Sequence, residues 1–187
     1  MVNNIIENYV FNLTKMLSTI DKKQVEEVVL RILKLKSERK TLYICGNGGS
    51  AANAIHISND FTFGVSPDGN SISVEALSAN SSIITCIGND IGYENIFSHQ
   101  LKVKGKSGDC LILLSGSGNS LNIVNAIQQA KILDIDTIAI LGFDGGKVKS
   151  LVNIPIHFEI NDMQISEDLQ LVVGHLLMRL LYEKLSK

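Results

Sequence analysis

The sequence predicts an α/β protein built on a doubly wound, mainly parallel five-stranded sheet flanked by helices. Short apolar segments alternate with amphipathic ones along the chain, as in repeated strand–helix units. The segments at 42–45 and 110–114 are apolar throughout, which is typical of parallel strands covered on both faces. Each is followed by a loop rich in glycine or serine. Ligands of such sheets bind beyond the carboxyl ends of the strands, so we expect the functional site at these two loops.

Three further strands and a series of helices complete this prediction. Strands are expected at 71–77, 137–141 and 154–160, between residues that favour turns. Asp21 is expected to cap the second helix, and residues 88–92 to form a turn. The pattern of apolar residues predicts one helix after the first loop. It predicts further helices at 2–18, 22–38, 81–87, 93–102, 123–133, 147–151 and 164–187.

A single domain is expected to span residues 1–187, with a helical arm at 1–38, an α/β core at 40–160 and a C-terminal helix at 163–187. We find no linker and no low-complexity segment in the sequence. The two helices of the arm precede the first strand, and they could either cover the sheet or build an oligomer. The pattern favours neither alternative.

Composition and charge exclude several classes of partner. With 45% hydrophobic and 19% charged residues, the chain has the composition of a soluble globular protein. The net charge of −2 and the absence of a basic helix argue against nucleic-acid binding. No apolar run is long enough to span a membrane, and the N-terminus lacks a signal-peptide pattern. Three cysteines without paired spacing fit a reducing compartment, so we expect a cytoplasmic protein.

The first loop, Gly-Asn-Gly-Gly-Ser at 46–50, has the features of an anion site. Its glycines permit positive φ angles and a close approach of the backbone to a ligand. Ser50 is expected to cap the following helix, leaving amide N–H groups and the positive end of the helix facing the loop. A phosphate is the natural occupant. An ordinary tight turn with a serine cap is the alternative.

The second loop, Ser-Gly-Ser-Gly-Asn-Ser at 115–120, makes the phosphate interpretation stronger. It offers three hydroxyls, an amide and two glycines at a strand-to-helix junction, without a competing negative charge. A polar turn with a cap remains the alternative. This second loop does not match the Walker pattern, because no lysine follows its glycines, and the first loop does not fit a dinucleotide fingerprint well. Nucleotide binding is therefore a weaker alternative. Residues 88–90, Gly-Asn-Asp, could contact a sugar hydroxyl or merely turn the chain.

Two pairs of histidine and carboxylate residues could carry chemistry. His56 and Asp60 are four residues apart, so they share one helix face, and Glu167 and His175 lie on the final helix. Such a set could bind a divalent metal, zinc being the natural candidate. It could equally carry protons in an aldose–ketose isomerisation. Taken singly, His175 could be a core histidine, and Glu167 could serve the helix dipole.

The spacing of the second pair constrains any metal site. Glu167 and His175 are separated by about 12 Å if both lie on one regular helix, so one ion cannot bind both. Either the helix begins after Glu167, or the site forms between subunits with each supplying one member. We favour the second arrangement.

Together these motifs resemble the SIS (sugar isomerase) family, and specifically its phosphoheptose (sedoheptulose 7-phosphate) isomerase branch. The resemblance covers nearly the whole chain. It is carried by the helical arm, the loops at 46–52 and 115–120, His56 with Asp60, the segments at 88–90 and 145–147, and the final helix with His175.

The resemblance implies the SIS fold and conversion of sedoheptulose 7-phosphate to D-glycero-D-manno-heptose 7-phosphate for surface-glycan (lipopolysaccharide or capsule) synthesis. It also implies a homotetramer with active sites between subunits and one Zn²⁺ per subunit. By position, His56, Asp60, Glu167 and His175 would hold the metal, with Asp60 and His175 as the acid/base pair. The substrate would be bound by Asn47, Gly48, Gly49, Ser50, Asn89, Asp90, Ser115, Gly116, Ser117, Ser120 and Glu167.

The chain departs from the family pattern at four positions. Asp60 replaces the usual Glu, and Glu167 the usual Gln, so two anionic ligands stand where the family has one. Ile165 occupies the position of an Arg, and Gly116 that of a Thr. These changes keep the phosphosugar interpretation but leave the exact sugar open.

Two alternatives from other classes remain. One is a non-catalytic SIS module that binds a phosphosugar or a protein partner; its function would not need the four ionisable positions. The other is a nucleotide-binding regulator, which would need a DNA-binding helix that the sequence lacks.

Overall fold

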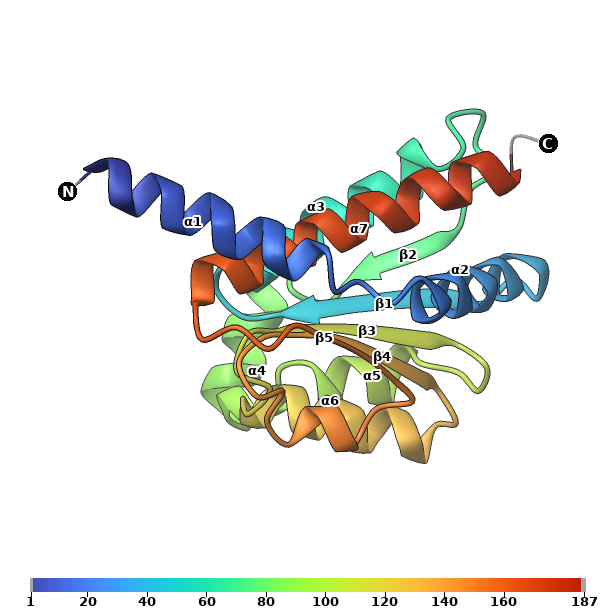
Figure 1. The fold of residues 1–187 in the computed structure, drawn as a ribbon. Helices are drawn as coiled ribbons and strands as arrows, with labels where there is room; N and C mark the ends of the chain where they lie inside the picture. Colours follow the sequence, from blue (N-terminus) through green and yellow to red (C-terminus); the bar gives the residue numbers. More distant parts are fainter. Residues whose placement is uncertain (1, 186–187) are drawn as a thin grey trace.

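The computed structural model describes residues 2–185, which form a five-stranded parallel sheet with helices on both faces (Figure 1). The strand order is β2-β1-β3-β4-β5, and every neighbouring pair is parallel. The predicted doubly wound sheet is therefore confirmed, although β2 and β5 are shorter than expected. The strands are β1 (Thr41–Gly46), β2 (Ser73–Ala76), β3 (Cys110–Ser115), β4 (Asp136–Leu141) and β5 (Ile154–His157).

Seven α-helices and three short helical turns surround the sheet in the described part of the chain. Met1, Ser186 and Lys187, which belong to the predicted arm and final helix, lie outside the described residues. The single turns are η1 (Asp60–Gly64, a π-helix), η2 (Tyr93–Asn95) and η3 (Val148–Ser150). The α-helices are α1 (Val2–Leu17), α2 (Lys22–Ser37), α3 (Gly49–Asn59), α4 (Ser81–Asp90), α5 (Ser98–Lys104), α6 (Leu121–Ile132) and α7 (Met163–Leu185). None of these helices is long and apolar enough to cross a membrane.

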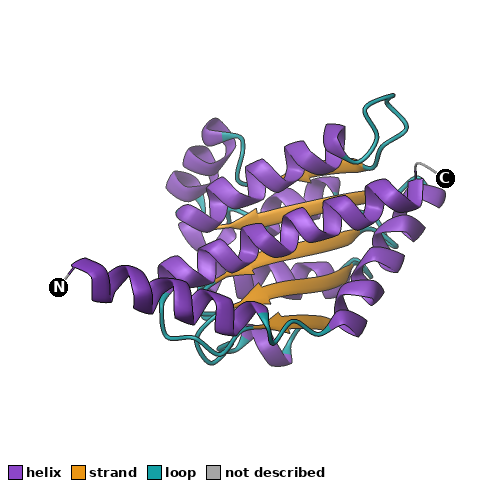
Figure 2. Ribbon diagram, turned by 45° about the horizontal axis from the view of Figure 1, so that its top comes forward, coloured by secondary structure: helices purple, strands orange, loops and turns teal. Residues whose placement is uncertain are grey.

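The sheet separates two hydrophobic cores. Side chains alternate along β1, so Leu42 and Ile44 pack under α2, α3 and α7, whereas Tyr43 and Cys45 face α4, α5 and α6. Figure 2 shows the strands lying beneath the first of these helical layers, with all arrowheads directed to one side. Burial raises the pKa of the Cys45 and Cys110 thiols, which keeps both in the unreactive protonated form.

The two helices of the arm have different roles in the structure. Helix α2 covers the sheet, with Val28 and Ile32 fully buried, and its N-terminus is capped as predicted by Asp21, which accepts a hydrogen bond from the Lys23 amide at 2.8 Å. In α1 only Met16 is buried, and the helix projects past the body of the molecule (Figure 1). Covering the sheet therefore explains α2, whereas α1 packs on α7 along one side only and leaves its other side exposed.

Two expectations between β2 and β3 are wrong. The predicted turn at 88–92 begins only at Ile91, because the Ile91 amide still bonds to the Ile87 carbonyl at 2.9 Å and α4 continues to Asp90. The predicted helix at 93–102 is divided into η2 and α5. Ile96 and Phe97 at the junction are each 1% exposed, so the chain bends where these side chains enter the core.

The order of the strands locates a ligand site. The chain runs from β1 outward to β2 and then returns to β3 on the other side of β1. Gly46 at the end of β1 is in register with Leu114 of β3, so the loops after these two strands emerge side by side. A reversal of strand order between neighbouring strands opens a crevice at their carboxyl ends, which is the usual ligand position in such sheets.

Candidate active site

A cavity of about 240 Å³ lies at this reversal point, between the β1–α3 and β3–α6 loops. The structure thus brings together most of the residues predicted to bind substrate. Asn89 and Asp90 are absent from its lining; they lie exposed at the end of α4, where the Asn89 side chain donates to Asp90. The lining residues are Asn47, Gly48, Gly49, Ser50, Leu114, Ser115, Gly116, Ser117, Ser120, Met163 and Glu167.

The first loop presents the N-terminus of α3 to this cavity. Gly48 is the N-cap residue, with φ of 56°, a backbone conformation that favours glycine. The prediction that Ser50 caps the helix is wrong, because Ser50 lies inside the first turn, 4% exposed, and no side chain caps α3. The amides at this end of α3 therefore have no side-chain cap and face the cavity, as a phosphate site requires, with the Glu167 carboxylate beside Gly49.

The second loop is held in shape by its own hydrogen bonds and by the loop after β4. Ser115 Oγ accepts from the Gly118 amide at 3.1 Å, and the Gly118 carbonyl accepts from the Val148 amide at 3.0 Å. Ser120 is the N-cap of α6, but its hydroxyl caps no amide of that helix. The Ser120 hydroxyl and the open end of α6 therefore remain available to a ligand.

Replacing Gly118 by alanine should destabilise this loop strongly. A methyl group there would lie 2.0 Å from the Gly145 carbonyl oxygen, and φ is +62°. We expect the free energy of unfolding to fall by about 3 kcal/mol, from about 1 kcal/mol of backbone strain and about 2 kcal/mol of overpacking. Gly69→Ala is the matched control, because φ there is also positive but the space is open. Urea denaturation measures both, and equal losses would contradict the steric argument.

The second part of the site is a cluster of His56, Asp60 and His175. The Nε2 atoms of the two histidines are 3.0 Å apart, and each lies 3.4 Å from Asp60 Oδ2. His56 comes from α3 and His175 from α7, while Asp60 begins the π-helical turn η1 that follows α3. The predicted pairing of His56 with Asp60 on one face is confirmed, and α7 adds the second histidine.

The geometry of this cluster fits a zinc ion. Ligand atoms about 2.1 Å from a tetrahedral zinc are about 3.4 Å from one another. The three donor atoms lie at 3.0, 3.4 and 3.4 Å from each other, close to that spacing. Two neutral imidazoles and one carboxylate form a set that occurs in catalytic zinc sites, where water or substrate takes the fourth position. The histidine side chains are about half exposed, so a substrate can reach them.

Glu167 lines the cavity between the two loops and lies apart from this cluster. The alternative in which the final helix begins after Glu167 is wrong, because α7 begins at Met163. The Glu167 carboxylate packs so closely against Gly49 that a Cβ atom added to Gly49 would clash with it. The group of possible metal ligands in the described chain comprises His56, Asp60 and His175 alone. A single chain therefore does not bring Glu167 to the metal position.

Comparison with known proteins decides the family. The SIS domain model matches residues 8–142. The chain belongs to the SIS domain family. It is similar to a phosphoheptose isomerase of Clostridium acetobutylicum, 38% identical over 153 residues that cover 82% of this chain and 78% of the relative. One from Aliarcobacter butzleri is 33% identical over 174 residues, covering 93% and 92%. The structure of phosphoheptose isomerase GmhA from Neisseria gonorrhoeae matches with a TM-score of 0.88, at 26% identity and 96% coverage of both chains.

Two residues at the site of this SIS domain escaped the sequence analysis. Asn122 was expected to precede a helix beginning at residue 123, but α6 begins at Leu121 and buries the Asn122 side chain. Tyr93 was assigned only to a helix, yet its hydroxyl donates to Asn47 Oδ1 at 3.1 Å. A buried asparagine among apolar helix positions is a usable signal, since such a side chain needs partners. No feature of the sequence indicates the contact of Tyr93 with Asn47.

Proposed function

We propose that this SIS domain is an aldose–ketose isomerase that converts sedoheptulose 7-phosphate to D-glycero-D-manno-heptose 7-phosphate. The relatives named above as phosphoheptose isomerases support the substrate. The observation that carries the proposal is the division of the site along α3. Gly49 in the phosphate cavity and His56 in the cluster are about 10 Å apart on one helix. An extended seven-carbon sugar phosphorylated at one end can span that separation.

Proton transfer between adjacent carbons is the chemistry required. Asp60 takes a proton from C1 of the ketose, and His175 donates a proton to the carbonyl oxygen on C2, which gives an enediol. Because His175 Nε2 is the atom that faces the metal position, the proton comes from its Nδ1. Return of a proton to C2 and removal of the hydroxyl proton at C1 then yield the aldose. The contacts of Asp60 to both imidazoles use Oδ2, so its other oxygen can take part in this transfer. A zinc ion held by His56, Asp60 and His175 would polarise the sugar oxygens.

Turnover in deuterium oxide tests this function. The zinc-loaded protein should convert sedoheptulose 7-phosphate to an aldose phosphate that carries deuterium at C2, as followed by NMR. If the folded protein gives neither product nor label, it is not this isomerase. A thermal shift produced by the same sugar phosphate in that case would favour the non-catalytic binding module.

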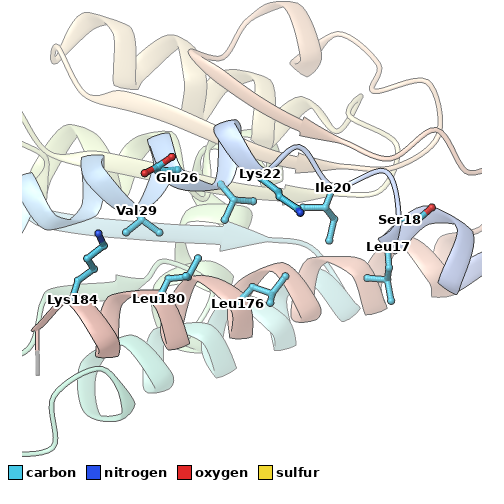
Figure 3. A pocket seen from close by; sticks show the side chains of 10 residues that line it. Leu17, Ser18, Ile20, Lys22, Glu26, Val29, Leu176, Leu180 and Lys184 are labelled. Carbon is cyan, nitrogen blue, oxygen red and sulfur yellow. The ribbon is translucent and has the colours of Figure 1, made fainter.

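The exposed part of α1 supports assembly into a homo-oligomer. A row of its apolar side chains is more than half exposed, although such residues are normally covered. A groove of about 670 Å³ on the same molecule lies where α1, α2 and α7 meet (Figure 3). Six of its ten lining residues are apolar: Leu17, Ile20, Val25, Val29, Leu176 and Leu180. The exposed residues of α1 are Val2, Ile5, Ile6, Val10 and Phe11.

We assign the groove to a second copy of this chain. The chain itself supplies both an exposed apolar face on α1 and an apolar groove, so two copies can cover each other reciprocally. A subunit bound along α1 would lie near the site. The Tyr9 hydroxyl of α1 donates to Asp168 Oδ2 at 2.6 Å, and Asp168 is the neighbour of Glu167 in α7. That hydrogen bond raises the pKa of Tyr9 to about 12. We favour a tetramer with sites completed between subunits, in which Asn89, Asp90 or Glu167 of a neighbour would contribute.

Charges on the exposed face of α1 should dissociate this assembly. Ile6 and Val10 lie one turn apart and are 56% and 57% exposed. The Ile6→Asp/Val10→Asp variant should shift the mass measured by light scattering from tetramer to monomer, because burying two carboxylates is unfavourable. Asn4→Asp on the same helix is the control and should keep the wild-type mass. A monomeric wild type at working concentration would contradict both the assembly and the intersubunit site.

We also place the reaction in the cytoplasm, within surface-glycan synthesis. The support for the compartment is that Cys45, Cys86 and Cys110 are all free thiols.

A further inference from the structure

Two asparagines connect the two loops of the phosphate cavity. Asn122 Nδ2 donates to Asn47 Oδ1 at 2.8 Å, and Asn47 Nδ2 donates back to Asn122 Oδ1 at 2.9 Å. The Tyr93 hydroxyl donates to the same Asn47 oxygen at 3.1 Å. Asn47 follows β1, Asn122 lies in the first turn of α6, and Tyr93 begins η2. Three segments distant in sequence thus meet at one amide.

The three residues differ in their access to the ligand. Asn47 lines the cavity, whereas Asn122 is 2% exposed and does not. A buried amide without hydrogen-bond partners is unfavourable, so Asn122 is tolerated there because Asn47 satisfies it. Asn122 therefore acts on the ligand only through Asn47.

Counting the hydrogen bonds of Asn47 shows what it can offer. A carboxamide has two N–H donors and an oxygen with two lone pairs. The oxygen is taken by Asn122 and Tyr93, and one N–H is taken by Asn122. One N–H is left for the cavity. Asn47 can therefore only donate to a ligand, and its partner must be an acceptor such as a phosphate oxygen.

We propose that Asn122 is a positioning residue for the phosphorylated substrate. It holds the Asn47 amide so that the remaining N–H faces the anionic end of the sugar phosphate, and Tyr93 supports the same orientation. The identity of the sugar rests on the proposed function, but the positioning role requires only that the cavity binds a phosphate ester.

Kinetics of Asn122→Ala test this role. We expect KM for sedoheptulose 7-phosphate to rise about tenfold, as for loss of one hydrogen bond to a charged group, with kcat changed less than about twofold. Gln128→Ala is the control, because Gln128 is exposed on the same helix. The control should leave KM unchanged. An equal rise in both variants, or a fall in kcat alone, would overturn the proposal.

A double-mutant cycle separates positioning from a general loss of stability. If Asn122 acts only through Asn47, the Asn47→Ala/Asn122→Ala variant should bind no more weakly than Asn47→Ala, whereas additive losses would overturn the proposal. Tyr93→Phe, at a side chain that is 56% exposed, should fold normally and weaken binding about threefold.

Calorimetry with sedoheptulose 7-phosphate and with inorganic phosphate gives these affinities without turnover. If the wild type binds a probe but does not turn over sedoheptulose 7-phosphate, the proposed isomerase function is contradicted. The affinities of the variants for that probe would still test the positioning role of Asn122. No binding of either probe to the wild type would overturn it.

Discussion

Replacing His175 by alanine is expected to lower kcat for sedoheptulose 7-phosphate by about 10³-fold, within the range for loss of a general acid or base. His175 Nε2 lies 3.4 Å from Asp60 Oδ2 and 3.0 Å from His56 Nε2, so its removal leaves the proposed acid/base pair with one member. Initial rates and deuterium incorporation measure the effect. His175 of α7 lies beside His56, near the C-terminal end of α3, whereas the cavity lies at the N-terminal end of α3. The affinity for inorganic phosphate should therefore be retained.

The histidine at position 99 provides the control for this variant. His99 lies on the exposed surface of α5, beside Lys102 and Gln129 and away from both loops. His99→Ala should therefore keep the wild-type rate. Full activity of His175→Ala in a folded protein would remove the cluster from the mechanism.

Removing the charge of Asp60 is expected to have the second largest effect. Asp60 is the only anion among the three donors, so Asp60→Asn should weaken zinc binding by at least about 100-fold, more than is typical for loss of a residue that only supports a ligand. Calorimetric titration of the metal-free protein with zinc measures this directly. Chelation should lower the melting temperature of the wild type and leave that of Asp60→Asn unchanged, because bound metal stabilises the folded state.

A longer carboxylate distinguishes charge from reach. Asp60→Glu keeps the charge and adds one methylene, so zinc binding should remain within about tenfold of the wild type if the π-helical turn can adjust. Turnover of this variant against a panel of ketose phosphates would show whether the shorter Asp60 sets the choice of sugar. Unchanged zinc affinity in Asp60→Asn would contradict the metal assignment.

Most of the fold could be predicted because its signals are local. The apolar runs of β1 and β3 are typical of strands buried on both faces, and the loops that follow them have glycine at positions with positive φ, Gly48 and Gly118. Errors occurred where packing overrides local preference. Ile96 and Phe97 divide the helix expected at 93–102, since burying both requires a bend.

The site was predictable in part for the same reason. His56 and Asp60 are close because of helical spacing alone, and the two loops meet because parallel neighbouring strands end together. Glu167 and His175 could not be placed from spacing. Only the packing of α7 on α3 decides that His175 joins His56, 119 residues away, while Glu167 lies against Gly49.

The sequence by itself thus determined the sheet, both loops and the chemical types at the site, since these depend on periodicity and on the conformational range of glycine. The tertiary structure alone decided three other features: that α2 covers the sheet while α1 projects, that the Ser50 side chain is buried and caps no helix, and that Asn122 meets Asn47. Each depends on contacts between segments far apart in the chain, which no local pattern encodes.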